Sequence, residues 1–262
     1  TRIMEDKRAK RLTIFLIPFM SCSAKMPLYL LISSVFFPTH QFMIISIIYL
    51  LGIPLAIFTA YLFKSSIFKD DSGLFVMELP DYKMPSLKNL RIHVWDRIKD
   101  FVERAGTVIL GATITIWFLQ SFNTKFEYVS DSSKSILSFI GNLIAPIFTI
   151  CGFGTWEATV SLISGIIAKE SIVSTMSVLY SQGGEVLNHT LSTVFTPLSA
   201  LSFMVFVLLY TPCVAAISAM YKELKSLRLT IFYVIYQFLL ALFVSAFIFQ
   251  FGSLIQKIVR SV

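Results

Sequence analysis

Stretches of about 20 mostly apolar residues recur along this chain, and each is long enough to cross the hydrocarbon core of a membrane as a helix. Inside a bilayer no water can bind the backbone, so a spanning segment must satisfy its own N–H and C=O groups. We therefore predict an all-α fold, a polytopic transmembrane helical bundle with about seven hydrophobic elements, some of them broken or re-entrant. The elements are Leu12–Phe37, Phe42–Phe63, Phe101–Phe122, Ile136–Cys151, Trp156–Tyr180, Leu198–Tyr221 and Leu229–Phe251.

The composition and charge agree with a membrane protein. Hydrophobic residues make up 56% of the 262 positions and charged residues 14%, whereas a soluble domain carries about 25% charged residues. The net charge is +7, but the basic residues cluster beside apolar runs, as in Lys7–Arg11. Short cytoplasmic loops of membrane proteins collect Lys and Arg in this way. The charge therefore indicates topology, and we expect no nucleic acid partner.

Basic residues predict which loops face the cytoplasm. The cytoplasmic parts should be the N-terminus, Lys64–Lys99 and Lys222–Arg228, and the opposite side should hold Pro38–Gln41, Asn123–Ser135 and Ser181–Thr196. Strict alternation gives this arrangement, but it puts the C-terminus outside, where Lys257 and Arg260 are unfavourable. Prolines and glycines interrupt 136–180, so part of that stretch is expected to be re-entrant.

The end of the long loop carries a helical pattern of its own. Apolar residues recur at three- and four-residue intervals over Leu87–Phe101, and charged residues such as Lys88 and Arg91 occupy the opposite face. This predicts an amphipathic helix. It would lie either on the cytoplasmic membrane surface or against a partner domain.

The first candidate site is the sequence PFMSCSAKMP at residues 18–27, inside an apolar run. Pro18 and Pro27 each lack an N–H and should free a carbonyl four residues earlier. Broken helices with free carbonyls form ion sites in many transporters. The polar side chains between the prolines are Ser21, Cys22, Ser23 and Lys25. The alternative is a kinked helix in which Cys22 is a small core residue.

A second proline–cysteine pair, Pro212-Cys213, lies in another apolar element, where Pro212 should free the carbonyl of Leu208. Thiolates suit late first-row metals, and carbonyl and hydroxyl oxygens suit harder ions. If Cys22 and Cys213 face one cavity, they form a transient mixed sulfur and oxygen site for a divalent transition metal.

The third candidate is Ala168-Lys169-Glu170, within the helix predicted over Trp156–Tyr180. Ionisable residues at membrane depth are costly and usually face a bundle interior or a pathway. Small and polar residues at helical spacing favour close helix packing as the alternative. That alternative does not explain Glu170, which we therefore take as a functional candidate, with Lys169 in a structural role.

Absent motifs exclude several functions. The chain has no GxxxxGK[ST] loop, so it carries no P-loop nucleotide site, and it has neither GxSxG nor HExxH. Its three cysteines lack CxxC spacing, so neither a zinc site nor a disulfide framework is indicated. We predict a chain without catalytic residues or a bound cofactor.

Together these motifs resemble the ferrous iron transport protein B (FeoB) family, and the similarity follows the chain in order. Its motifs here are Arg11-Leu12-Thr13-Ile14 before PFMSCSAKMP, Glu78-Leu79-Pro80-Asp81-Tyr82, Trp95, Phe101, Arg104-Ala105-Gly106 and Trp117, Gly165 with Ala168-Lys169-Glu170 and Tyr180, and Tyr210, Pro212-Cys213 and Glu223. Lys25 stands where the family commonly has arginine, which keeps the charge but not the fork geometry.

The resemblance implies a multi-pass permease of the bacterial inner membrane that moves Fe²⁺ past Cys22 and Cys213, with Ser21, Ser23 and Glu170 nearby. Pro18, Lys25, Pro27, Gly165, Lys169 and Pro212 would shape or gate the path. In the family a GTP-binding domain and a first gate domain precede this region. GTP would therefore act only through that domain. Lipid, small FeoA- or FeoC-type proteins and a second copy of the chain are the further partners implied.

The resemblance also implies a division of the chain. Residues 1–63 would be a central membrane segment, 64–100 a cytoplasmic loop, 101–251 a second gate-type domain and 252–262 a tail. Two other functions stay open: a nucleoside-type permease, because gate-type domains resemble parts of nucleoside transporters, and a membrane scaffold that transports nothing. Channel or pump mechanism, coupling to GTP and selectivity among Fe²⁺, Mn²⁺ and Zn²⁺ are also open.

Overall fold

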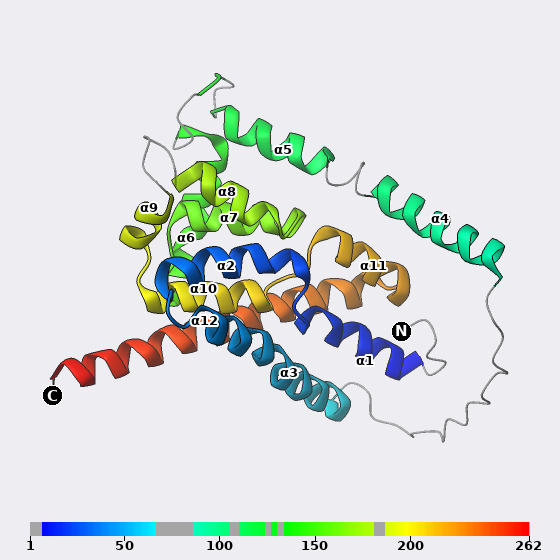
Figure 1. The fold of residues 1–262 in the computed structure, drawn as a ribbon, viewed down its shortest axis with the longest axis horizontal. Helices are drawn as coiled ribbons and strands as arrows, with labels where there is room; N and C mark the ends of the chain where they lie inside the picture. Colours follow the sequence, from blue (N-terminus) through cyan, green and yellow to red (C-terminus); the bar gives the residue numbers. More distant parts are fainter. Residues whose placement is uncertain are drawn as a thin grey trace.

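The computed structural model describes residues 7–66, 86–104, 110–123, 127–129, 134–180 and 187–261, and within them the regular structure is helical apart from one isolated β-bridge. This confirms the predicted all-α bundle (Figure 1). The helices are α1 (Lys7–Leu16), α2 (Met26–Phe36), α3 (Gln41–Ser66), α4 (Leu87–Arg104), α5 (Leu110–Ser121), α6 (Ile136–Phe148), α7 (Trp156–Ile167), α8 (Ser171–Tyr180), α9 (Leu187–Val194), α10 (Pro197–Leu209), α11 (Val214–Leu224) and α12 (Leu227–Ser261).

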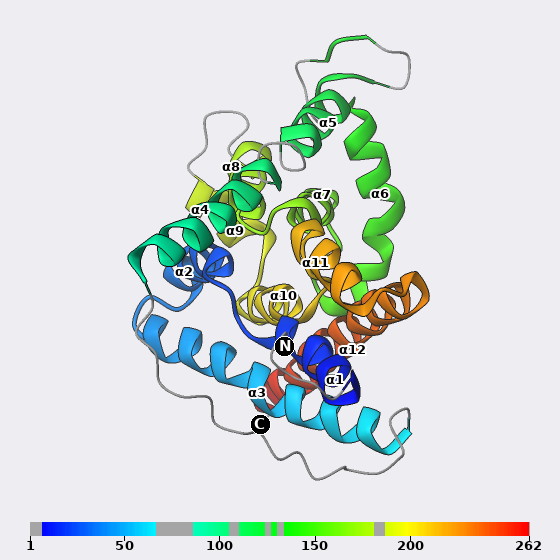
Figure 2. The same ribbon diagram turned by 90° about the vertical axis from the view of Figure 1, so that its right-hand side faces the viewer.

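Helix α10 is the centre of the bundle. It lies among α1, α2, α3, α7, α11 and α12 in the view of Figure 2, and it packs most extensively against α12. Its sequence is apolar on every side, which is the pattern of a helix surrounded by protein. From Ser202 to Leu209 every side chain is buried. The C-terminal end of α10 is therefore surrounded by other parts of the protein.

Four helical segments are long and apolar enough to cross a membrane: Ala9–Phe36, Gln41–Phe63, Pro197–Leu224 and Leu227–Val259. The first and third are broken helices, as predicted. A further pair, α6 and α7, meets the same test together but is bent by 100°. The chain is thus a multi-pass membrane protein with four or five candidate spans among the described residues, fewer than its seven hydrophobic elements.

The continuous helix predicted over Trp156–Tyr180 is wrong, because the chain turns back at residues 168–170. A hydrogen bond of 3.1 Å joins the hydroxyls of Thr155 and Tyr180, and one of 3.0 Å joins those of Ser164 and Thr175. These pairs show that α7 and α8 run antiparallel. They form a hairpin with residues 168–170 at its tip.

Other boundaries also differ from prediction. The loop predicted over 181–196 contains α9, and the last helix, predicted to end at Phe251, continues to Ser261. Of the predicted element Phe101–Phe122, α5 accounts for 12 residues. The motif Glu78–Tyr82 and the pair Ala105-Gly106 lie outside the described residues.

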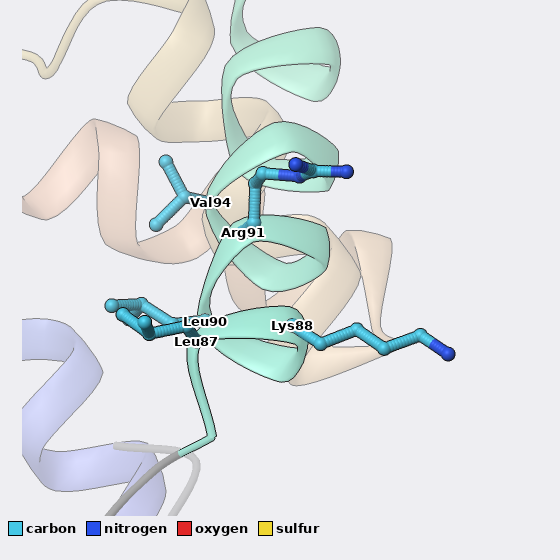
Figure 3. Close-up of a pocket in the computed structure, with 5 residues that line it drawn as sticks. All are labelled: Leu87, Lys88, Leu90, Arg91 and Val94. Carbon is cyan, nitrogen blue, oxygen red and sulfur yellow. The ribbon is translucent and has the colours of Figure 1, made fainter.

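The predicted amphipathic helix is confirmed as α4, which lies beside the bundle rather than inside it (Figure 1). Figure 3 shows Leu87, Leu90 and Val94 on one side of α4, with Lys88 and Arg91 pointing away from them. These five residues line an open hollow of about 650 Å³. All five belong to one helix and none is a metal ligand, so this hollow does not fit a cation site. Contact with a membrane surface or a partner domain stays a prediction.

An ion pair joins two broken helices at the end of the bundle that holds the N-terminus. The Lys10 ammonium on α1 lies 2.8 Å from the Glu223 carboxylate on α11, and the two side chains are 26% and 19% exposed. Partly exposed pairs contribute about 0.2–1 kcal/mol. We expect a double-mutant cycle of Lys10→Gln and Glu223→Gln to give a coupling energy within this range. A coupling energy of zero, measured by thermal unfolding, would show that this ion pair does not stabilise the fold.

Candidate functional site

Three helix breaks meet at one pocket in the middle of the bundle. The pocket has a volume of about 310 Å³. It is bordered by the break between α1 and α2, the tip of the α7–α8 hairpin, and the break between α10 and α11. The lining residues are Ile17, Pro18, Met20, Ser21, Cys22, Lys25, Lys169, Tyr210, Pro212, Cys213 and Ala216. Cys22 and Cys213, about 190 residues apart in sequence, both line this pocket.

The first break is an extended segment between two short 3₁₀ turns, Ile17–Phe19 and Ser23–Lys25. Met20 and Cys22 have extended backbone angles, so Ser21 and Cys22 project from chain outside any helix. Pro18 is the second residue of the first turn, where a proline is tolerated because its N–H would have no helical partner.

Pro27 does not break a helix, contrary to prediction. It stands in the first turn of α2, where the absent N–H is no loss. The Ser23 carbonyl, which it was expected to free, accepts a hydrogen bond from the N–H of Met26.

The break between α10 and α11 has the cause that the sequence indicates. Helix α10 ends at Leu209, and Tyr210 and Cys213 are extended on either side of Pro212. Pro212 cannot donate to the carbonyl of Leu208. That carbonyl instead accepts a hydrogen bond of 2.7 Å from the Lys25 ammonium, across 183 residues of sequence.

At the hairpin tip a second lysine caps the same break. The Lys169 ammonium donates a hydrogen bond of 2.8 Å to the carbonyl of Thr211 and lies 3.1 Å from the centre of the Tyr210 ring. Both Lys25 and Lys169 are buried, with 4% and 5% of their surface exposed. Two ammonium groups from two different broken helices therefore hold the carbonyls of a third.

Hydroxyl groups satisfy the backbone at the hairpin tip. The Ser171 hydroxyl donates to the carbonyls of Ser164 at 2.9 Å and Ala168 at 2.7 Å. The serines that resembled a helix-packing stripe therefore act here as caps for a turn. Because these hydroxyls replace the missing helical hydrogen bonds, the chain turns at membrane depth without a proline.

Gly165 provides the room for this arrangement. The Tyr210 hydroxyl reaches over α7 toward the carbonyl of Leu162, at 3.4 Å. A Cβ atom at position 165 would overlap the Tyr210 hydroxyl and the side chain of Ile172. Glycine at this position thus permits the close approach of α10 to the hairpin.

The two pocket thiols differ from the third cysteine. Cys22 is exposed and Cys213 is half-buried, and both line the pocket. Cys151 is buried elsewhere, with its thiol 3.7 Å from the carbonyl of Leu242. In the part of the chain that the structure describes, no cluster of three or more His, Cys, Asp or Glu side chains occurs. A cation in the pocket would therefore meet two thiols, the thioether of Met20 and otherwise oxygen donors.

Two of the predicted ion-pathway residues do not join the pocket. Glu170 lies at the hairpin tip with its side chain exposed, and Ser23 is also exposed. Neither lines the cavity. Lys169 turns inward instead. Tyr210, whose sequence context marks only the family resemblance, forms part of the pocket wall.

Comparison with known proteins agrees with the sequence motifs. The family described as "Ferrous iron transport protein B C terminus" matches residues 45–97, and the Gate family, described as "Nucleoside recognition", matches residues 102–227. No solved structure was found to match this chain.

Two similar relatives are both named "Fe(2+) transporter FeoB". One from Staphylococcus aureus is 38% identical over 253 residues, and one from Methanocaldococcus jannaschii is 36% identical over 262 residues. A Porphyromonas gingivalis relative, 32% identical over 306 residues, is named a fusion of "Fe(2+) transport protein A" and the FeoB transporter.

The matches with these three relatives include 97% of this chain and 38%, 39% and 36% of the relatives, in the same order. The chain thus spans less than two-fifths of the length of the relatives it matches. On the two family matches and the relatives together, this chain belongs to the ferrous iron transport protein B family and corresponds to its C-terminal membrane region.

Proposed function

We propose that this region is the membrane permease part of a ferrous iron transporter and that Fe²⁺ passes through the pocket between the three helix breaks. The observation that carries the proposal is that Cys22 and Cys213, from two separate broken helices, line one cavity. The relatives' names supply the substrate.

The donor set suits a transient rather than a permanent site. Two thiolates bind a late first-row divalent metal, and binding releases their protons. Structural zinc sites, in contrast, use four protein ligands that close around the metal. A pocket with only two thiols among its lining residues lets a cation enter and leave.

The two lysines suggest how the path is gated. While the ammonium groups of Lys25 and Lys169 occupy the carbonyls of Leu208 and Thr211, a cation cannot use those oxygens. Their positive charge also repels Fe²⁺. Opening therefore requires the first break or the hairpin tip to move away from the α10–α11 break. In this proposal a GTPase domain outside this chain drives that movement.

The remaining predictions belong to the same proposal. The transporter would lie in the bacterial inner membrane, with lipid around it, and would contain a GTP-binding domain and a first gate domain. The fusion in the P. gingivalis relative supports a FeoA-type partner. A FeoC-type protein and a second copy are the other proposed partners. Exposed Glu170 and Ser23 would attract the cation near the pocket rather than bind it inside.

The test is uptake of radioactive Fe²⁺ under reducing conditions, in cells that lack their own ferrous importer and express the full-length transporter. We expect Cys22→Ser and Cys213→Ser to lower uptake at least about tenfold, as loss of metal-site contacts does. Cys151→Ser is the matched control, because that thiol lies outside the pocket, and it should retain uptake. Glu170→Gln should have a smaller effect.

Other outcomes would overturn the proposal. Unchanged uptake in the double variant Cys22→Ser plus Cys213→Ser would remove the thiols from the path. Uridine uptake that depends on this protein would favour a nucleoside permease instead. Intact partner binding without any metal uptake in the unsubstituted protein would favour a scaffold.

A further inference from the structure

Three buried polar side chains have oxygen or nitrogen atoms without a hydrogen-bond partner in the described part of the chain: Ser21, Tyr29 and Gln237. Ser21 lines the pocket. Tyr29 lies in α2, four residues after Lys25, so the two residues are on the same face of this helix. Its hydroxyl lies beside the Ser21 side chain and within electrostatic reach of Cys22. Two of the three unpartnered groups therefore lie together at the thiols.

Apart from the adjacent Ser21 side chain, the Tyr29 hydroxyl has no polar partner in the described part of the chain. Tyr29 is fully buried, and its chain neighbours Leu28 and Ile32 are buried apolar residues in the same core. Phenylalanine would fill this place without the cost of an unpaired hydroxyl. Buried polar atoms that lack a protein partner in native structures commonly bind water or an ion. Tyr29 does not itself line the pocket, but its hydroxyl adjoins Ser21, which does, so an ion in the pocket is the partner closest at hand.

The Ser21 oxygen is buried in this conformation, but rotation of its side chain would turn it toward the pocket that the residue lines. Ser21 lies between Met20 and Cys22, which both have extended backbone, so no helical hydrogen bonds fix its orientation. The pocket volume of about 310 Å³ also leaves room for water beside a cation, since a water molecule takes about 30 Å³ in the liquid.

We propose that the hydroxyls of Ser21 and Tyr29 form an oxygen-donor subsite beside Cys22 and Cys213, and that this subsite favours Fe²⁺ over Zn²⁺. The inference rests on the proposed iron path. Thiols alone would bind Zn²⁺ more tightly, because affinity rises from Fe²⁺ to Zn²⁺, so selectivity must come from geometry and ligand type. Zn²⁺ is satisfied by four ligands in a tetrahedron. Two neutral oxygens and water complete a larger coordination shell, which Fe²⁺ accepts.

The first experiment measures the Zn²⁺ concentration that halves uptake of radioactive Fe²⁺ by the full-length transporter. We expect Tyr29→Phe and Ser21→Ala each to lower this concentration about tenfold, the size of effect that outer contacts have on metal sites. Tyr180→Phe is the matched control. It removes a buried hydroxyl that pairs with Thr155 away from the pocket, and it should leave the competition unchanged.

A second measurement reports coordination directly. Co²⁺ bound to the purified full-length protein absorbs weakly when six-coordinate and strongly when tetrahedral. We expect weak bands in the unsubstituted protein and stronger bands in Tyr29→Phe. If Tyr29→Phe expresses poorly, Ser21→Ala, which removes the other oxygen, should also show stronger Co²⁺ bands.

The outcomes separate this inference from the iron path itself. Cysteine-dependent Fe²⁺ uptake with unchanged Zn²⁺ competition and unchanged Co²⁺ bands in both hydroxyl variants would overturn the subsite alone. A higher melting temperature of Tyr29→Phe in that case would identify an ordinary unpaired hydroxyl. Uptake that does not depend on Cys22 or Cys213 would instead overturn the proposed path.

Discussion

Lys25→Met is expected to lower the thermal stability of the purified protein and, because the break that borders the pocket loses its support and shape, to abolish most Fe²⁺ uptake even though a positive charge is removed from the path. The substitution keeps the length of the side chain but removes the donor to the Leu208 carbonyl, which Pro212 deprives of a helical partner. A buried carbonyl left unpaired costs about 1–3 kcal/mol. Because Lys25 is 4% exposed, water cannot replace the ammonium in this conformation.

Two variants show whether position and charge matter at Lys25. Lys257→Met removes an exposed lysine near the end of α12 and should change neither uptake nor melting temperature. Lys25→Arg keeps the charge and a donor, so it should retain more uptake than Lys25→Met. If Lys25→Met transports normally and melts at the same temperature, the hydrogen bond to Leu208 has no role in holding the break.

Gly165→Ala is expected to destabilise the protein by about 1–3 kcal/mol, the usual cost of overpacking a filled core. The added Cβ would overlap the Tyr210 hydroxyl and Ile172, so α10 and the hairpin would have to separate. Because Tyr210 lies under the Lys169 ammonium, this movement would also disturb the pocket. Uptake should therefore fall together with stability.

Gly111→Ala is the matched control for that substitution. Gly111 lies in α5, and a Cβ at this position would meet no atom within 4 Å. Alanine is the better helix former, by about 1 kcal/mol, so Gly111→Ala should be neutral or stabilising. Equal melting temperatures for the two variants and the unsubstituted protein would show that the hairpin adjusts to a larger residue at position 165.

The sequence predicts the spanning helices and two of the three breaks well, because these features are local. Length and hydropathy define α3 and α12 without reference to any other part of the chain. Proline chemistry places the break after α10, since Pro212 removes a donor wherever the rest of the protein lies. The same chemistry leads to a wrong prediction at Pro27, because it does not tell a helix start from a helix interior.

The hairpin tip could not be predicted locally. The chain turns at Ala168-Lys169-Glu170 without proline, and the turn is stabilised by a carbonyl 42 residues later, at Thr211. Small polar residues at helical spacing indicate an uninterrupted helix until that partner is known. Adjacent residues on a helix point about 100° apart, so composition alone also cannot say whether Lys169 or Glu170 faces inward.

In the candidate site, too, some features are local in sequence and others depend on distant residues. Both cysteines could be selected from their neighbouring prolines, but the role of Lys25 depends on a carbonyl 183 residues away. The hydroxyl of Tyr29 gives no signal in the sequence, where the residue looks like one aromatic among many. Only its burial without a partner distinguishes it.

The α7–α8 hairpin also constrains how the protein is made. Its arms have 12 and 10 residues, about 18 and 15 Å of helix, and neither can cross a hydrocarbon core of about 30 Å. Translation produces the hairpin before Thr211, so at that moment the Lys169 ammonium has no carbonyl to cap at membrane depth. The hairpin must therefore wait near the lipid headgroups until α10 and α11 have been inserted, and only then dock between helices already in place. Insertion of this region cannot follow the order in which its helices leave the ribosome.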